Sequence, residues 1–465
     1  MTKKLIDFKV PAGTIPDENP FKYDALERTP AIESLTQFIT RINSPFVFAI
    51  NAPWGSGKTV FLQLWQAFLK KSGHQCIYLD AWKMDFATDP LIGFLDELNA
   101  VPETNEKFKK AMQTTKKIAT ALAKRAIPAL GKILTAGALD IDKVVEDVVA
   151  EFVENELKDL VDVYSAEKTL IQKFKKSLSE VVSELRSVDK SKNLIIFVDE
   201  LDRCRPSFSI EVLERIKHLF DIEGAVFVLG IDKEHLAGSL KCVYGNSLNS
   251  DEYLRRFIDM EFLLPEPSST QYSNHLFERF SLAELFSKRT GQLQYDWQGF
   301  QKVFDALADF LRLNLRAREQ CLALLKSALL VTKDNEYIFP NLLASLIVFK
   351  VHASAQYREF VLGEGEAGIL LSFLSARPGG DKFLASYPGI VIESYLLGSK
   401  PTIEKNQRAI EAHRVKMNDG NEKSEVRSRS QHIVQTVNNM ERDFNGFPIL
   451  TYVIQKIELA ARFKT

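Results

Sequence analysis

Residues 52–59 of this 465-residue chain read Ala52-Pro53-Trp54-Gly55-Ser56-Gly57-Lys58-Thr59, and this segment is the strongest indication of the fold. It fits the phosphate-loop pattern of two anchor positions around four variable residues followed by Gly-Lys-Ser/Thr, with Ala52 replacing the first glycine. Gly55 and Gly57 let the backbone turn where a Cβ would clash, so successive N–H groups face a bound phosphate. Lys58 supplies an ammonium for the β- and γ-phosphates, and Thr59 offers a hydroxyl to Mg²⁺.

The flanks of this motif agree with a phosphate-binding role. Residues 45–51 (PFVFAIN) form an apolar run rich in strand formers, and residues 60–71 (VFLQLWQAFLKK) carry an apolar stripe at helical spacing. The loop therefore lies between a strand and the positive end of a helix, which favours a bound anion. We expect residues 52–59 together with Val60 to bind the nucleotide.

A second apolar run, residues 193–200 (NLIIFVDE), ends in Asp199 and Glu200. A carboxylate at the carboxyl end of such a strand can hold the Mg²⁺ shell, usually through water, and Asp199 occupies that position. Glu200 is placed to polarise the attacking water. We therefore predict Lys58 and Glu200 as catalytic residues, and Thr59 and Asp199 as the metal-binding pair.

Further polar residues near these motifs have two interpretations each. Asp232 ends the apolar run of residues 225–232, where it can sense the γ-phosphate, orient the water or simply cap a loop. Several arginines can contact a phosphate, in cis or as a finger from a neighbouring subunit, or can form structural ion pairs. These candidates are Arg203, Arg205, Arg255, Arg256, Arg316 and Arg318.

Composition sets limits on the class of protein. Hydrophobic residues make up 45% and charged residues 26%, values typical of a folded globular protein. Lys plus Arg number 60 against 61 Asp plus Glu, so the net charge of −1 gives no overall attraction for nucleic acid, although a local basic face stays open. Four dispersed cysteines suggest neither a zinc knuckle nor a disulfide framework, and the first residues lack a signal-peptide core. We expect a cytoplasmic location.

The order of predicted elements indicates an α/β fold. Apolar runs at residues 76–82, 193–200, 225–232 and 260–267 predict further strands, and a helix at 210–220 lies between two of them. Strand, helix, strand in this order forms a right-handed crossover and a mainly parallel sheet covered on both faces. We predict a P-loop NTPase core of three layers, with a large helical insertion and a helical C-terminal region.

We expect three regions along the chain. The core covers residues 1–270 with a helical insertion at about 100–190, a helical lid covers 271–345, and a C-terminal helical region covers 346–465. Residues 118–141 are apolar but interrupted by charges and a proline, so we predict an amphipathic helix packed on protein and no membrane span. The polar residues 401–430 predict a mobile loop, and the amphipathic residues 449–463 a docked final helix.

The motifs together resemble the KAP family of P-loop NTPases. The matching pieces are PWGSGKT, LDAWKMD, FVDELDRCRP, VFVLGIDKEHL and DEYLRRFIDMEFLLPEP, within residues 19–267, with a weaker helical match near 311–331. The resemblance implies an additional-strand core that binds ATP and Mg²⁺, with core roles for Lys58, Thr59, Asp199 and Glu200. Many members carry Asp at the position of Glu200, and many have membrane helices where this chain has a charged insertion.

The resemblance also implies a bacterial signalling or phage-defence setting, by analogy only. Our leading hypothesis is an ATPase that works as a nucleotide-driven switch, with a protein partner or self-association through the helical insertion and the C-terminal helices. A small-molecule phosphotransferase, a non-hydrolysing nucleotide-binding scaffold and a nucleic-acid motor are the alternatives. The choice of ATP over GTP comes from the resemblance, and the absence of an NKxD motif agrees with it.

Overall fold

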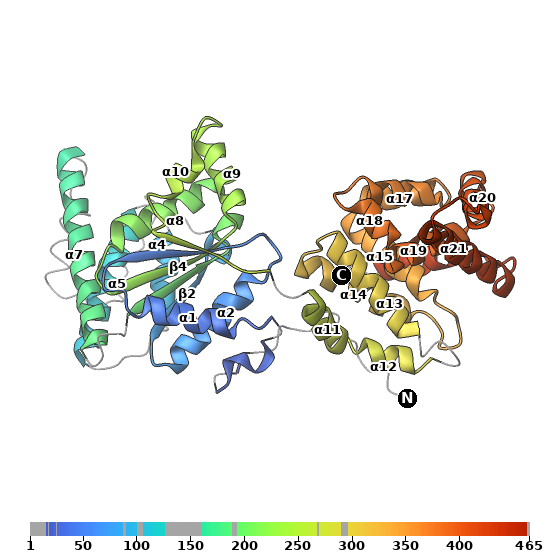
Figure 1. Ribbon diagram of the computed structural model, residues 1–465. Coiled ribbons are helices and arrows are strands. Elements are labelled where there is room, and N and C mark those ends of the chain that lie inside the picture. Colours follow the sequence, from blue (N-terminus) through green and yellow to red (C-terminus); the bar gives the residue numbers. More distant parts are fainter. Residues whose placement is uncertain are drawn as a thin grey trace. The chain divides into compact units, whose positions relative to one another are not determined.

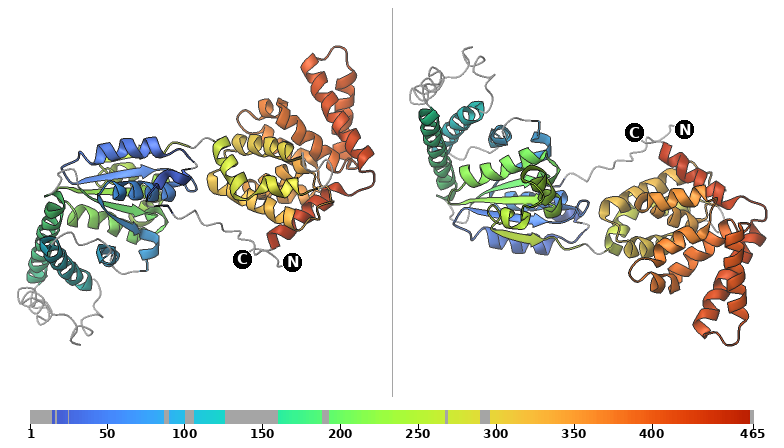
Figure 2. Two further views of the ribbon diagram at one scale, coloured as in Figure 1. Left: turned by 90° about the horizontal axis from the view of Figure 1, so that it is seen from below. Right: turned by 90° about the horizontal axis from the view of Figure 1, so that it is seen from above.

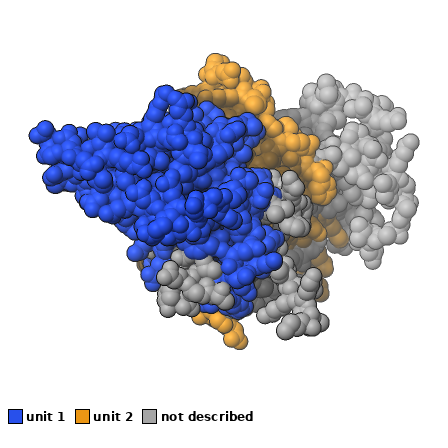
Figure 3. Space-filling view, turned by 90° about the vertical axis from the view of Figure 1, so that its right-hand side faces the viewer, with its two compact units in different colours: residues 1–12, 267–465 blue, residues 13–266 orange. Residues whose placement is uncertain are grey.

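The computed structural model describes residues 15–16, 18–24, 26–86, 90–99, 106–125, 160–187, 193–266, 269–289 and 296–462. The chain divides into two compact units, which Figure 3 colours separately. Residues Gly13–Glu266 form one, here called the α/β unit, and Pro267–Thr465 together with Met1–Ala12 form the other, here called the helical unit.

The α/β unit is built on a five-stranded parallel sheet (Figure 1). Its strand order is β2-β3-β4-β1-β5, and every neighbouring pair is parallel. β4 thus separates the strand before the phosphate loop from the strand that ends in Asp199, as an additional-strand core requires. The predicted α/β class is confirmed. The strands are β1 (Phe46–Asn51), β2 (Gln75–Asp80), β3 (Leu194–Asp199), β4 (Ala225–Ile231) and β5 (Met260–Leu263).

Helices cover both faces of this sheet (Figure 2). Side chains alternate along a strand, so Ile195 and Phe197 of β3 pack with α1 and α2 while Ile196 and Val198 pack with α4 and α8. This alternation explains why all six residues of β3 are buried. The helices are η1 (Pro20–Tyr23), α1 (Thr29–Ile39), α2 (Lys58–Lys71), α3 (Ala81–Met84), α4 (Pro90–Asn99), η3 (Leu201–Arg203), α8 (Pro206–Leu219), α9 (Lys233–Tyr244) and α10 (Ser250–Leu254).

The described part of the insertion consists of two long helices that pack together, α5 (Glu106–Arg125) and α7 (Leu160–Arg186). Ile118 and Leu122 of α5 are buried in the same core as Phe174 and Leu178 of α7. The amphipathic helix predicted from residue 118 is therefore present as far as Arg125, and residues 126–141 lie outside the described residues. Among the helices the structure describes, none combines the length and apolar character needed to cross a membrane.

The helical unit has one continuous core, which joins residues from Leu276 to Ile457. Residues of the predicted lid and of the predicted C-terminal region both contribute to it, and the final helix docks there as predicted. The helices are α11 (Ser269–Arg279), α12 (Leu282–Ser287), α13 (Asp296–Phe310), α14 (Leu315–Leu330), α15 (Pro340–His352), α16 (Ser354–Leu362), α17 (Ala367–Ser375), α18 (Gly380–Ala385), α19 (Tyr387–Ser399), α20 (Glu404–Asn418), α21 (Ser424–Asp443) and α22 (Ile449–Arg462).

The prediction of a mobile loop at residues 401–430 is wrong. α20 and α21 occupy most of this stretch and pack together. Their apolar anchors are few but lie at helical spacing, and Ile410, Ile433 and Val437 are buried. Polar composition describes the exposed faces of this helix pair and says little about its buried stripe.

Candidate functional site

The phosphate loop has the backbone that its glycines predict. Gly55 and Gly57 have φ angles of 80° and 88°, in the left-handed region where residues with a Cβ are strained. α2 begins immediately afterwards at Lys58. The Lys58 ammonium is buried and donates to the carbonyl oxygens of Ala52 at 2.6 Å and Pro53 at 3.3 Å. Lys58 thus lies folded against the loop that it is predicted to serve.

Electrostatics around Lys58 are acidic. Burial lowers the pKa of its ammonium, and the carboxylates of Asp202, Asp232 and Asp199 act in the opposite direction, while Arg203 adds to the lowering. Three acids from the ends of β3 and β4 therefore surround one lysine. Such an arrangement suits a site whose ligand brings both negative phosphate and a divalent cation.

Asp199 is held in a defined orientation. One carboxylate oxygen accepts a hydrogen bond from the Tyr78 hydroxyl at 2.7 Å, and the other accepts one from the backbone N–H of Glu200 at 2.9 Å. Burial raises the pKa of Asp199, whereas hydrogen bonds from Tyr78, Thr59 and Glu200 lower it. The Thr59 hydroxyl and the Asp199 carboxylate are therefore adjacent, the arrangement that a shared metal ion requires.

Gly230 of β4 makes room for this carboxylate. Gly230 pairs with Asp199 in the sheet, and a Cβ added to it would lie 2.5 Å from Leu62 Cδ1 and 2.7 Å from Asp199 Oδ1. Both distances are shorter than real Cβ contacts allow. The position therefore requires glycine for close packing, although its φ is not in the left-handed region.

Glu200 stands next to Asp199 at the turn that leaves β3. Its φ of 59° is left-handed, unusual for a residue with a side chain. Its carboxylate forms an ion pair of 2.8 Å with Arg203, three residues later. Burial raises the pKa of Glu200, and Arg203 lowers it.

Trp54 ties the phosphate loop to its two neighbouring strand ends. Its backbone N–H donates to Asp232 at 3.1 Å, and its indole N–H donates to Asp202. The indole ring stacks on His235 with centroids 3.7 Å apart, and His235 Nδ1 lies 3.0 Å from Asp232. Asp232 also caps α9 by accepting from the backbone N–H of His235. Both interpretations of Asp232 remain compatible with this position.

The predicted arginines have different surroundings. Arg203 belongs to the site through Glu200, whereas Arg205 binds Asp85 with its backbone N–H and its Nε, at 2.9 and 2.8 Å. Arg255 and Arg316 are exposed, and Arg256 lies over the Tyr253 ring.

Arg318 is buried inside the helical unit. Its guanidinium donates to Leu313 O at 3.2 Å, Ser273 Oγ at 3.1 Å and Asp309 at 2.6 Å. These contacts favour the structural interpretation of Arg318 over the finger.

Sequence reasoning missed several residues of this site. Tyr78 lies outside every quoted motif, and Asp202 and His235 lie within the family motifs but were assigned no role, although each is within three residues of a predicted strand end. The Ser56 hydroxyl is buried without a hydrogen-bond partner among the described residues, which suits a loop that awaits a ligand.

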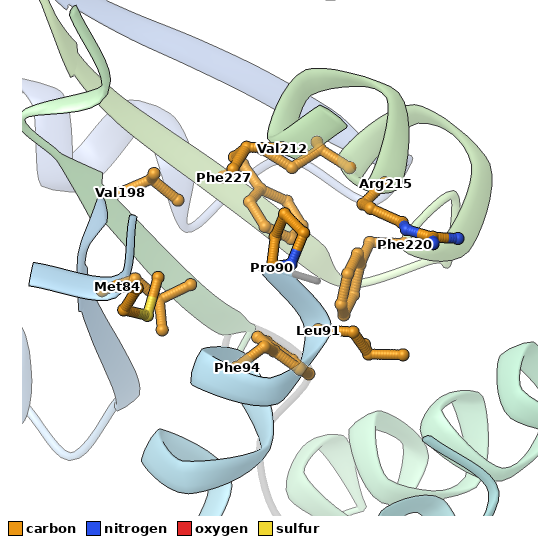
Figure 4. Close-up of a pocket in the computed structure, with 11 residues that line it drawn as sticks. Met84, Pro90, Leu91, Phe94, Val198, Val212, Arg215, Phe220 and Phe227 are labelled. Atoms are coloured by element: carbon orange, nitrogen blue, oxygen red, sulfur yellow. The ribbon is translucent and has the colours of Figure 1, made fainter. Parts of the chain in front are cut away.

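An apolar pocket lies away from this site, on the sheet face covered by α4 and α8 (Figure 4). It has room for about 20 Å³, and Arg215 is its one charged lining residue. The pocket is too small and too apolar for a nucleoside triphosphate. Its other lining residues include Leu79, Met84, Pro90, Phe94, Val198 and Phe227.

A glycine-rich loop connects β1 to α2, and β3, which ends in Asp199, is separated from β1 by β4 in the parallel sheet. These two features together define a P-loop nucleoside triphosphatase. The model of the KAP family P-loop domain matches residues 28–332, more than half of the chain. The chain therefore belongs to the KAP family, as the motifs predicted. This match continues past Glu266 into the helical unit.

Other comparisons are weaker. No curated protein matches the sequence. Among solved structures, the Aeropyrum pernix ORC2 protein in ADPNP–ADP complexes is similar at 12% identity and a TM-score of 0.32, over 93% of this chain and 95% of that one. Drosophila ORC bound to GC-rich DNA and Cdc6 gives 12% identity and a TM-score of 0.27, over 93% of this chain and 70% of that one. TM-scores this low carry no inference about function.

Proposed function

We propose that the chain binds ATP with Mg²⁺ and hydrolyses it, and that turnover drives a conformational switch. The observation that carries the proposal is the meeting of Lys58, Thr59, Asp199 and Glu200 at the carboxyl ends of β1 and β3. Two features of the loop fit a bound polyphosphate. The Ser56 hydroxyl is buried without a hydrogen-bond partner among the described residues, and the loop glycines are left-handed.

Thr59 and Asp199 would hold the metal ion. When bound, Mg²⁺ neutralises charge that develops on the phosphate oxygens. Lys58 exchanges its loop carbonyl partners for phosphate oxygens, a change from neutral to ionic acceptors that strengthens its hydrogen bonds. Glu200 accepts a proton from the attacking water, and Asp232 holds the Trp54 end of the loop in place.

The switch rests on the arrangement of the chain into units. The family match runs from the α/β unit into the helical unit, so the nucleotide core and the first helices beyond Glu266 fall within one family domain. A nucleotide that binds two states of such a domain with different affinity shifts their populations. We propose that α5, α7 and the C-terminal helices deliver this change to a protein partner or a second copy. By resemblance, the setting is bacterial signalling or phage defence, and the dispersed cysteines agree with a cytoplasmic location.

Steady-state release of phosphate tests the proposal. Wild type, Lys58→Ala, Glu200→Gln and the control Lys70→Ala are compared with ATP and GTP, with Mg²⁺ or with a chelator in excess. Lys70 is an exposed lysine of the same helix. We expect ATP hydrolysis that needs Mg²⁺, a loss of about 100-fold or more in both site variants, and no change in the control.

The alternatives give different results in the same assay. Equal basal rates in wild type and Glu200→Gln would favour a nucleotide-binding scaffold that does not hydrolyse. Phosphate transfer only in the presence of a small acceptor would indicate a phosphotransferase, and strong stimulation by DNA would indicate a motor. Normal turnover in Lys58→Ala would refute the proposed site.

A further inference from the structure

We propose that Arg203 is a positioning residue that restrains Glu200, and that the Glu200–Arg203 ion pair must open before hydrolysis. This inference rests on the proposed function, because it assigns the base role to Glu200. The expected effect on the hydrolysis rate is opposite to that of an arginine finger: loss of a finger slows the reaction, whereas loss of Arg203 should speed it.

The first observation is the ion pair itself. Arg203 Nη1 lies 2.8 Å from Glu200 Oε1, and the two side chains are 30% and 16% exposed. A carboxylate that is neutralised by a guanidinium at this distance is a weaker proton acceptor than a free one. In this structure the carboxylate of Glu200, the predicted base, is therefore paired with the Arg203 guanidinium.

The second observation is the backbone that brings the two groups together. Glu200 adopts a left-handed φ of 59°, and the single turn η3 follows at once. The backbone N–H of Arg203 donates to Glu200 O at 3.1 Å and closes this turn. A left-handed conformation costs a residue with a side chain about 1 kcal/mol, so packing around the turn maintains this arrangement.

The third observation is the other support of Arg203. Its guanidinium carbon lies over the Trp82 ring, 5.6 Å from the centroid, and Trp82 is 54% exposed. A partly exposed ion pair and a partly exposed cation–π contact are each weak, on the order of 1 kcal/mol. The pair is thus formed but easily opened.

Arg205, in the same segment, has the contacts of a structural arginine. It makes hydrogen bonds to both carboxylate oxygens and to the carbonyl oxygen of Asp85. Those contacts join the segment after η3 to the end of α3. Among the described residues, the side chain of Arg203 contacts the Glu200 carboxylate and the Trp82 ring, so its charge faces the group predicted to activate water.

The test measures kcat and KM for ATP hydrolysis at neutral pH in Arg203→Ala, Arg203→Lys, Trp82→Ala and the double variant Arg203→Ala/Glu200→Gln. Arg41→Ala, an exposed arginine of the same unit, is the control. We expect Arg203→Ala to raise kcat about three- to tenfold with little change in KM.

The other variants sharpen this result. Arg203→Lys keeps the charge and should behave like wild type, and Trp82→Ala should show a smaller rise in the same direction. The double variant should be as slow as Glu200→Gln alone, because the gain depends on the freed carboxylate. Far-ultraviolet circular dichroism confirms that each variant is folded.

Two outcomes overturn the inference while leaving the proposed function intact. One is a fall in kcat for Arg203→Ala, which would mark Arg203 as part of the reaction. The other is an unchanged kcat and KM in Arg203→Ala. Absence of phosphate release from every variant, wild type included, would instead overturn the proposed function and this inference with it.

Discussion

Both units bury ionisable groups, but they use them differently. In the α/β unit, Lys58, Asp199, Asp202 and Asp232 are buried around one point at the ends of parallel strands. In the helical unit, buried charges connect helices to one another. Burial of a charged side chain therefore does not by itself mark a reaction site. A reaction site is indicated where several buried charged side chains surround a loop that is able to bind a ligand.

A hydrogen-bonded serine–histidine–glutamate set in the helical unit contrasts most clearly with the phosphate site of the α/β unit. His413 contacts Ser430 and Glu393, each at 3.1 Å, and Arg429 pairs with the same glutamate. The order resembles a hydrolase triad. All three residues are less than a tenth exposed, however, and they come from α19, α20 and α21, so the set fastens these helices.

The largest effect that we expect comes from Arg318. Arg318→Leu should lower the free energy of unfolding by about 3 kcal/mol, because Ser273 and the Leu313 carbonyl lose a buried donor and Asp309 its ion-pair partner. Hydrolysis per folded molecule should stay within about twofold of wild type. Urea unfolding and the phosphate assay measure these quantities.

Arg316→Leu, an exposed change on the same helix, serves as the stability control and should shift unfolding by less than about 0.5 kcal/mol. If Arg318→Leu unfolds like wild type but loses activity, Arg318 belongs to the site and the comparison between the units fails.

Asp199→Asn should show the opposite pattern. Hydrolysis should fall about 100-fold, since an amide binds Mg²⁺ far less well than a carboxylate. The free energy of unfolding at neutral pH should not fall, because burial raises the pKa of Asp199 and the charged form is the costly one in the folded chain. A variant that is both fully active and less stable would reverse the roles assigned to the two units.

Gly230→Ala tests the fit between β4 and Asp199. The added Cβ would meet Asp199 Oδ1 and Leu62, so we expect about a tenfold loss of turnover and a stability cost of about 1 to 3 kcal/mol. Gly238→Ala is the matched control: it lies on α9 with open space around the added Cβ, and should stabilise the helix by up to about 1 kcal/mol. Equal activity of the two variants would show that Asp199 tolerates displacement.

The smallest effect concerns pH. Burial raises the pKa of Asp305, in the helical unit, to about 6. The folded chain then binds a proton more tightly than the unfolded chain between about pH 4 and 6, so stability falls as pH rises through that range and is level above it. Asp305→Asn should remove this slope, about 1 to 2 kcal/mol after allowance for partial exposure. Identical slopes in the two proteins would contradict the assignment.

The strands of the α/β unit could be predicted from the sequence alone. Its buried strands consist of continuous apolar residues, so their positions could be predicted to within a few residues at each end. The phosphate loop and the acids Asp199 and Glu200 were also readable, because backbone geometry and charge at a strand end demand particular residue types at fixed spacing.

The contacts between residues far apart in the sequence depend on the tertiary structure. The hydroxyl of Tyr78, the indole of Trp54 and the guanidinium of Arg203 acquire their partners through strand order and through a left-handed turn at Glu200. The same holds for α20 and α21, whose few apolar residues are buried by neighbouring helices. Local composition fixes which face of an element can be buried, but pairing between elements depends on contacts far apart in the chain, which spacing along the sequence does not contain.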